Sequence, residues 1–189
     1  MSLGCYTRGL RVYTTIVRED QEAAYNSVRR GVMDYDRRHG LRTLVGQLGV
    51  GFARLGIETT FVDPSEPDNF RRAIRPSTRA LYGETIGNPL VNVLDIEAVA
   101  RIAHDHGLPL VIDNTVASPY LCNPFDFGAD IVVHSATKYL GGHGTTMAGV
   151  VVESGKFDWG SPLAREKFAE ILEPSRAYHG VKFYETFGD

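Results

Sequence analysis

Residues 129–138 read Ala-Asp-Ile-Val-Val-His-Ser-Ala-Thr-Lys, and Gly-Gly-His-Gly follows at 141–144. The apolar, β-branched run at 131–134 predicts a buried strand. Lys138 therefore lies just past the end of a strand, between hydroxyl side chains and glycines. The chain has four lysines and carries most of its basic charge on arginine. A lysine amine, unlike a guanidinium, can lose its proton and form a Schiff base, so Lys138 is a candidate catalytic residue.

From Arg54 onward, strand and helix patterns alternate along the chain. Asp95 is placed to cap a helix that reaches His106, and Gly107 is placed to end it. Strands that are apolar throughout are typical of a sheet buried on both faces, so we predict an α/β fold with a mostly parallel sheet. The predicted strands cover residues 57–62, 79–84, 108–113, 131–134 and 148–152, and the predicted helices cover residues 67–74 and 95–106.

The carboxyl ends of parallel strands are where functional groups gather in such sheets. Asp113 and Lys138 both follow strands, and together they match the needs of pyridoxal phosphate (PLP): a lysine for the aldehyde and a carboxylate for the ring nitrogen. Ser135 and Thr137 are two residues apart, so in an extended segment their hydroxyls would face the same side and could meet the phosphate. Asn88, in a turn after a strand, is a candidate contact for the cofactor or a substrate carboxylate.

Each of these residues also has a structural interpretation. Asp113 can be a helix cap or turn residue, and Ser135 and Thr137 can be turn hydroxyls. Asn88 precedes Pro89 and by default forms a turn, while Lys138 can be a solvated strand end. The order and spacing of the whole set favour the cofactor site.

Composition limits the other classes of function. The chain has 189 residues, 43% of them hydrophobic and 23% charged, with a net charge of −3. These values are typical of a globular protein and do not indicate a nucleic-acid or membrane partner. Cys5 and Cys122 lie far apart, which fits free thiols in a reducing compartment. No signal segment or membrane span is visible, so we expect a cytoplasmic protein.

Other site motifs are missing from the sequence. The histidines at 104, 106, 134 and 143 have no HExxH or cysteine-rich spacing, so we expect no metal. The glycines at 46, 49 and 51 do not form a GxGxxG motif after a strand, and there is no GxSxG elbow.

Several stretches resemble the PLP-dependent enzymes of cysteine and methionine metabolism, and those beyond the lysine are most similar to the O-acetylhomoserine sulfhydrylase branch. The resemblance covers about residues 53–189. It is carried by Gly-Glu-Thr-Ile-Gly-Asn-Pro at 83–89, Val-Ile-Asp-Asn-Thr at 111–115, Ser-Ala-Thr-Lys-Tyr-Leu-Gly-Gly-His-Gly at 135–144, Gly-Lys-Phe-Asp-Trp at 155–159 and Tyr-His-Gly at 178–180.

This resemblance implies the large domain of the aspartate-aminotransferase fold, with the Schiff-base lysine at Lys138. It also implies a ring-nitrogen partner at Asp113 and phosphate contacts at Ser135 and Thr137. The implied reaction replaces the acetyl group of O-acetylhomoserine with sulfide or a thiol, giving homocysteine or methionine. The implied partners are the amino-acid substrate and the thiol, and members of the family are expected to be homo-oligomers.

The chain departs from this family in its first part. Residues 1–52 hold arginine clusters and no clear period, so we interpret them as a poorly packed leader and residues 53–189 as a partial, incomplete PLP-binding domain. The family's phosphate cup and substrate arginine are not found, so we expect negligible activity from the chain alone. Two alternatives stay open: cystathionine γ-synthase or γ-lyase activity on the same fold, and a non-catalytic remnant that pairs with an intact homologue.

Overall fold

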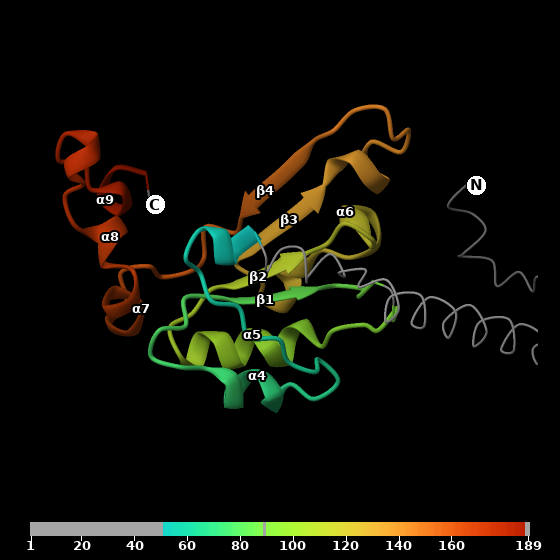
Figure 1. The fold of residues 1–189 in the computed structure, drawn as a ribbon, viewed down its shortest axis with the longest axis horizontal. Coiled ribbons are helices and arrows are strands. Elements are labelled where there is room, and N and C mark those ends of the chain that lie inside the picture. The colour runs from blue at the N-terminus through green and yellow to red at the C-terminus, as the bar shows by residue number, and fades with distance from the viewer. Residues whose placement is uncertain (1–50, 89, 188–189) are drawn as a thin grey trace, which may run out of the picture. The chain divides into compact units, whose positions relative to one another are not determined.

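The centre of the protein is a four-stranded sheet with the order β1-β2-β3-β4. In the computed structural model, residues 51–88 and 90–187 are described. The first three strands run parallel, and β4 runs antiparallel to β3 (Figure 1). The predicted α/β fold with a mostly parallel sheet is confirmed. The strands are β1 (Leu81–Glu84), β2 (Leu110–Asp113), β3 (Ile131–Ser135) and β4 (Gly149–Glu153).

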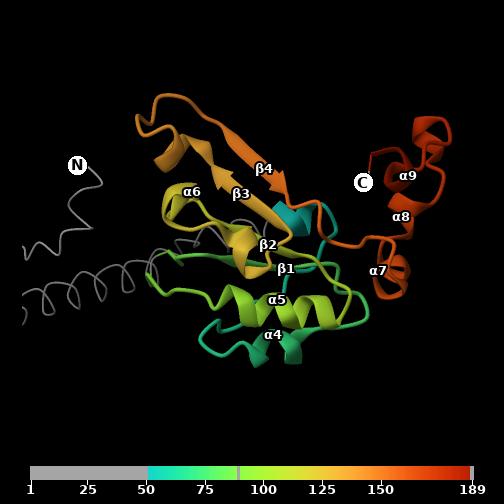
Figure 2. The same cartoon turned by 180° about the vertical axis from the view of Figure 1, so that it is seen from behind.

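Helix α5 covers one face of this sheet, and α4 packs against α5 (Figures 1 and 2). The segments after β4 form short helices that follow one another along the chain. The helices are α4 (Asp68–Ala73), α5 (Ile96–Asp105), α6 (Ser118–Leu121), α7 (Pro162–Lys167), α8 (Ala169–Leu172) and α9 (Phe183–Phe187), with 3-10 turns at Pro124–Phe127 and Arg176–Tyr178 and a π-helical segment at Ala136–Leu140.

Helix α5 has the start and end that the sequence predicts. The Asp95 side chain accepts a hydrogen bond of 3.0 Å from the backbone N–H of Ala98, which caps the first turn. Gly107 follows the helix with a φ of +62°, a conformation that favours glycine. A Cβ atom on Gly107 would also lie 2.5 Å from Leu163 Cβ, so this turn packs closely against α7.

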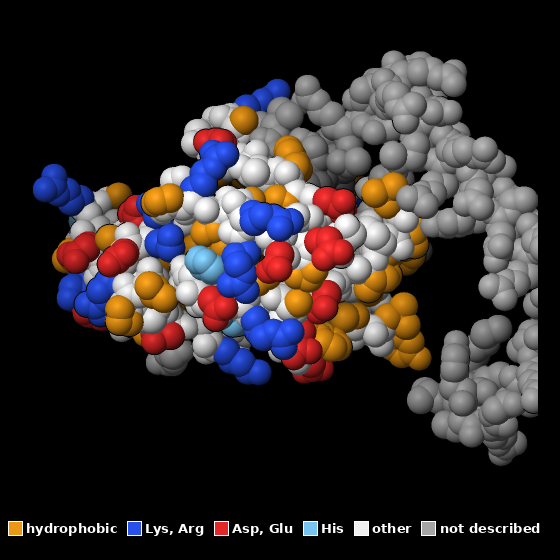
Figure 3. Space-filling model, turned by 90° about the horizontal axis from the view of Figure 1, so that it is seen from below, with side chains coloured by type: hydrophobic (Ala, Val, Ile, Leu, Met, Phe, Trp, Pro, Cys, Tyr) orange, Lys and Arg blue, Asp and Glu red, His pale blue; other side chains and the backbone are white. Residues whose placement is uncertain are grey.

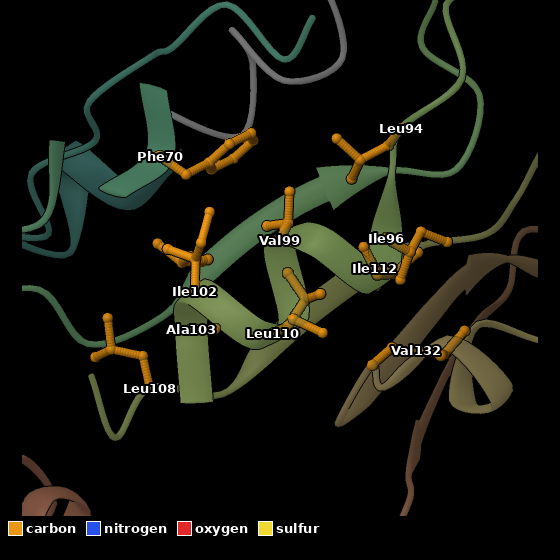
Figure 4. Close-up of a cluster of buried hydrophobic side chains, with 13 residues drawn as sticks. Phe70, Leu94, Ile96, Val99, Ile102, Ala103, Leu108, Leu110, Ile112 and Val132 are labelled. Carbon is orange, nitrogen blue, oxygen red and sulfur yellow. The ribbon is translucent and has the colours of Figure 1, made fainter. Parts of the chain in front are cut away.

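The hydrophobic core lies between α5 and the sheet. Val99 of α5 and Leu110 and Ile112 of β2 are fully buried. Phe70 of α4 points toward the same cluster (Figure 4). Burial of these side chains fixes α5 on one face of β2 and leaves Asp113 on the other face.

Two predictions about strands are wrong. Residues 57–62 form no strand, and all of them are exposed except Val62, which packs against the core. Among the described residues, the segment has no neighbouring strand to pair with. Strand β4 forms as predicted but is exposed at all five residues. It pairs with β3 at the edge of the sheet, and no described helix packs over its valines. Its apolar sequence therefore does not correspond to burial on both faces.

The predicted leader at residues 1–52 lies almost wholly outside the described residues, which begin at Gly51. Its packing stays a prediction. Within the described residues, no helix has the length and apolar character needed to cross a membrane.

The outer face of α4 and α5 carries charges of both signs. Figure 3 shows this face, with basic and acidic side chains interspersed over it. Arg101 pairs with Glu97 at 2.9 Å, and Arg71 approaches Asp105 at 3.7 Å. Such a mixed surface is typical of a solvated helix face and does not form a basic patch that would attract nucleic acid.

Leu110 and Leu121 offer a matched test of the core. Leu110 is fully buried, whereas Leu121 is 73% exposed. We expect Leu110→Ala to lower the free energy of unfolding by about 2–5 kcal/mol, and Leu121→Ala to change it by about 0.5 kcal/mol or less. Urea unfolding followed by circular dichroism measures both. Equal effects of the two substitutions would contradict this placement of the core.

Candidate active site

The candidate site lies at the carboxyl ends of β1, β2 and β3. Asp113 is the register partner of Glu84 on β1 and of Val133 on β3. Side chains alternate along a strand, so Asp113 lies on the face opposite Ile112 and away from the core. Ser135 is two residues beyond Val133 and therefore lies on the same face as Asp113. Parallel pairing thus brings two of the predicted site residues to one edge of the sheet.

Both oxygens of the Asp113 carboxylate accept hydrogen bonds. The backbone N–H of Thr115 donates to Oδ1 at 2.9 Å, and the Tyr82 hydroxyl donates to Oδ2 at 3.3 Å. Burial, helped by the negative charge of Asp113, raises the pKa of Tyr82, so this hydroxyl remains a donor. These two bonds hold the carboxylate in a fixed orientation.

Thr115 also connects Asp113 to Ser135. Its hydroxyl Oγ1 accepts a hydrogen bond of 2.8 Å from the backbone N–H of Ser135. One residue therefore fixes the carboxylate at the end of β2 and the start of the segment that follows β3. Sequence reasoning did not assign Thr115 a role, although its position two residues after a strand-end aspartate is a recognisable signal.

Asn114 fastens the end of β2 to its neighbours. It is fully buried, and its side chain accepts a bond of 2.8 Å from Thr85 Oγ1 and donates one of 2.8 Å to the Cys122 carbonyl. A buried amide with both ends satisfied rigidifies the segments that it joins. Asn114 thereby ties the end of β1 to the segment after α6, beneath the candidate site.

Lys138 lies in the π-helical segment after β3. Its backbone is non-helical, with φ −87° and ψ −117°, and its side chain is exposed. The backbone N–H of Gly142 donates to the Lys138 carbonyl at 2.8 Å, so the chain turns sharply around this residue. Within residues 51–88 and 90–187 the Lys138 amine makes no ion pair.

The segment from Ser135 to Thr137 is not extended, which corrects the geometry that we predicted for its hydroxyls. The strand ends at Ser135, and π-helical backbone begins at Ala136. Thr137 Oγ1 accepts a bond of 2.9 Å from the backbone N–H of Ala148 and approaches the Ala148 carbonyl at 3.3 Å. This hydroxyl therefore fixes the residue before β4, and its predicted phosphate contact is an additional role that stays a prediction.

Asn88 lies in an exposed loop that joins β1 to α5. The loop is closed by a bond of 2.9 Å from Gly87 N–H to the Asn92 carbonyl and by an isolated antiparallel bridge between Ile86 and Val93. The backbone N–H of Asn88 donates to Glu84 Oε2 at 3.1 Å. Asn88 is thus held near the end of β1, the strand that pairs with the Asp113 strand, β2.

Glu84 is a second residue that sequence reasoning did not assign. Burial, opposed by its bond from Asn88 and assisted by the charge of Asp113, raises the pKa of the Glu84 carboxyl. Glu84 and Asp113 are half-buried direct neighbours on the face of the sheet opposite the core. Glu84 therefore places a second carboxyl group beside Asp113 on this side of the site.

Residues 46–188 match the family of Cys/Met metabolism PLP-dependent enzymes. The chain belongs to this family. It is 55% identical over 137 residues to the O-acetyl-L-homoserine sulfhydrylase of Leptospira meyeri, covering 72% of this chain and 30% of that protein. It is 48% identical over 144 residues to the homocysteine/cysteine synthase of Saccharomyces cerevisiae, covering 76% of this chain and 32% of that protein. The chain spans about a third of the length of these curated relatives.

A solved structure supports the same assignment. An O-acetylhomoserine (thiol)-lyase of Campylobacter jejuni superposes with a TM-score of 0.68 and 31% identity, covering 72% of this chain and 33% of that one. That crystal structure contains N'-pyridoxyl-lysine-5'-monophosphate. The expected aspartate-aminotransferase type of fold is confirmed, with part of its large domain described.

Substitution of Thr115 tests the link between the two strand ends. Thr115→Val removes the acceptor for the Ser135 N–H, and we expect a loss of about 1–3 kcal/mol in the free energy of unfolding. The Ser135 amide should also exchange its hydrogen faster. Thr115→Ser keeps the hydroxyl and is the control. Equal exchange in both variants would show that the hydroxyl does not hold Ser135.

Proposed function

We propose that this chain binds PLP through Lys138 and forms the cofactor-binding part of an enzyme that acts on O-acetylhomoserine. The observation that carries the proposal is the oriented Asp113 carboxylate, tied through Thr115 to Ser135, three residues before Lys138. Membership of a PLP-dependent family supports the same reading.

Each predicted residue has a role in this proposal. Lys138 would attach the cofactor through Nζ and carry protons once released from it. Asp113 would hold a positive charge on the ring nitrogen, and Ser135 and Thr137 would contact the phosphate. Asn88 would contact the ring or the substrate from the β1 side. When bound, PLP supplies an electron-withdrawing ring that stabilises negative charge on an amino-acid substrate.

The proposed reaction is replacement of the acetyl group of O-acetylhomoserine by sulfide or a thiol. Relatives named as O-acetylhomoserine sulfhydrylase and homocysteine synthase support this reaction over the alternatives. We further propose a homo-oligomer in the cytoplasm. A γ-synthase or γ-lyase reaction and a non-catalytic partner of an intact homologue are the competing functions.

A product assay separates these functions. The purified protein with PLP and O-acetylhomoserine is supplied in turn with sulfide, with cysteine and with neither, and the products are identified by mass spectrometry. Homocysteine as the main product supports the proposal. Cystathionine would indicate the γ-synthase, and a keto acid formed without any thiol would indicate the γ-lyase. Cofactor binding with no product would favour the non-catalytic alternative.

Lys138 should be the site of covalent attachment. After PLP is added and the complex is reduced with borohydride, peptide mapping is expected to place the pyridoxyl group on Lys138. Lys138→Arg keeps the charge but cannot form the bond, so it should lose the label. Lys156→Arg is the matched control and should keep it. A label spread over Lys156, Lys167 and Lys182 would contradict the proposal.

Asp113→Asn should weaken PLP binding without disturbing the local structure. The amide oxygen can still accept from Thr115, but it cannot pair with a positive ring nitrogen. Loss of one charge-assisted hydrogen bond corresponds to about 1.5–3 kcal/mol, which is about a 10- to 150-fold rise in the Kd. Titration followed by absorbance measures this change. An unchanged Kd would mean that another group holds the ring nitrogen.

A further inference from the structure

Glu84 has a role in this site that neither the motifs nor the comparisons assign. It ends β1 directly beside Asp113, and its two carboxyl oxygens differ in their surroundings. Oε2 accepts the Asn88 N–H at 3.1 Å, whereas Oε1 is buried and has no hydrogen-bond partner among the described residues. A buried, unpartnered oxygen is costly for a carboxylate and much less costly for a carboxylic acid.

The bond from the Asn88 N–H links the Glu84 side chain to the loop that carries Asn88. The loop is closed on itself by backbone bonds between Gly87 and Asn92 and between Thr85 and Leu94. The Asn88 N–H takes no part in these backbone bonds and donates instead to the Glu84 side chain. The position of Asn88 relative to the end of β1 therefore depends on where the Glu84 carboxyl lies.

The charges around Glu84 all favour its neutral form. Asp113 on β2 is the charged group beside Glu84, whereas the Tyr82 hydroxyl on its own strand is neutral and donates to Asp113. The adjacent position on β3 is Val133, and loop residues 85–94 include no titratable side chain. No basic side chain among residues 51–88 and 90–187 pairs with Glu84.

We propose that Glu84 is a positioning residue that works as a neutral carboxylic acid: it holds Asn88 in place and leaves Asp113 as the single negative charge beside the ring nitrogen. Ionised Glu84 would put a second negative charge next to Asp113 in a half-buried position. Although an ionised carboxylate accepts the Asn88 N–H more strongly, desolvation is the larger of the two effects on Glu84, so the side chain would then turn toward water and release that N–H. This role rests on the proposed binding of PLP, but its first test does not.

The first test follows the Asn88 amide in the protein without cofactor. We expect its ¹H–¹⁵N signal to titrate with a midpoint above the ordinary glutamate pKa of 4.5, because burial and Asp113 both raise the pKa of Glu84. Glu84→Gln mimics the neutral acid and should abolish this titration. Glu97→Gln, on the exposed face of α5, is the control and should leave it unchanged. A midpoint at or below 4.5, or a titration that persists in Glu84→Gln, would overturn the proposal.

The second test measures PLP binding as a function of pH. If only the protonated form is competent, the Kd of the unchanged protein rises above the Glu84 midpoint by up to about tenfold per pH unit, relative to that of Glu84→Gln. Below the midpoint the two proteins should bind alike. Equal binding at every pH, or weaker binding by Glu84→Gln at low pH, would contradict the neutral role. Failure of both proteins to bind PLP would instead refute the proposed function, and the amide titration would still decide the role of Glu84.

Discussion

Parallel pairing of β1, β2 and β3 is the constraint on which the candidate site depends. It brings the carboxyl ends of three strands to one edge, so that Glu84, Asp113 and Ser135 share one face although they are distant in sequence. Burial of α5 against the opposite face holds this register, because a shift of one residue would move Ile112 out of the core and Asp113 into it. Core packing and the geometry of the site thus both follow from the alternation of side chains between the two faces of the sheet.

A short network of hydrogen bonds then orients the residues at the ends of these strands. Thr115 connects the Asp113 carboxylate to the backbone of Ser135, and Asn114 anchors the same turn from below. Thr137 fastens the segment around Lys138 to the start of β4. Such bonds position groups with little dependence on flexible side chains, which is what covalent and electrostatic catalysis requires.

Electrostatics on the β1 side complement these contacts. Tyr82 and Glu84 lie beside Asp113, and burial raises the pKa of both groups. One negative charge among neutral hydrogen-bonding groups is a more selective partner for a positive ring nitrogen than a cluster of charges would be.

Lys138 and Asp113 were predictable as candidate site residues because a lysine and an aspartate each follow a run of apolar β-branched residues, a local pattern. The limits of α5 were predictable because its cap and its terminal glycine are local too. The bond from Thr115 to Ser135 and the role of Glu84 were not, since each depends on a residue of another strand or loop that only the tertiary structure brings near. The exposure of β4 was not predictable either. Its apolar sequence shows that the strand could be buried, but it does not show whether another element covers it. By itself the sequence determined most of the elements and the chemistry at their ends. The pairing of strands, which depends on core packing between distant residues, decided which of those groups meet.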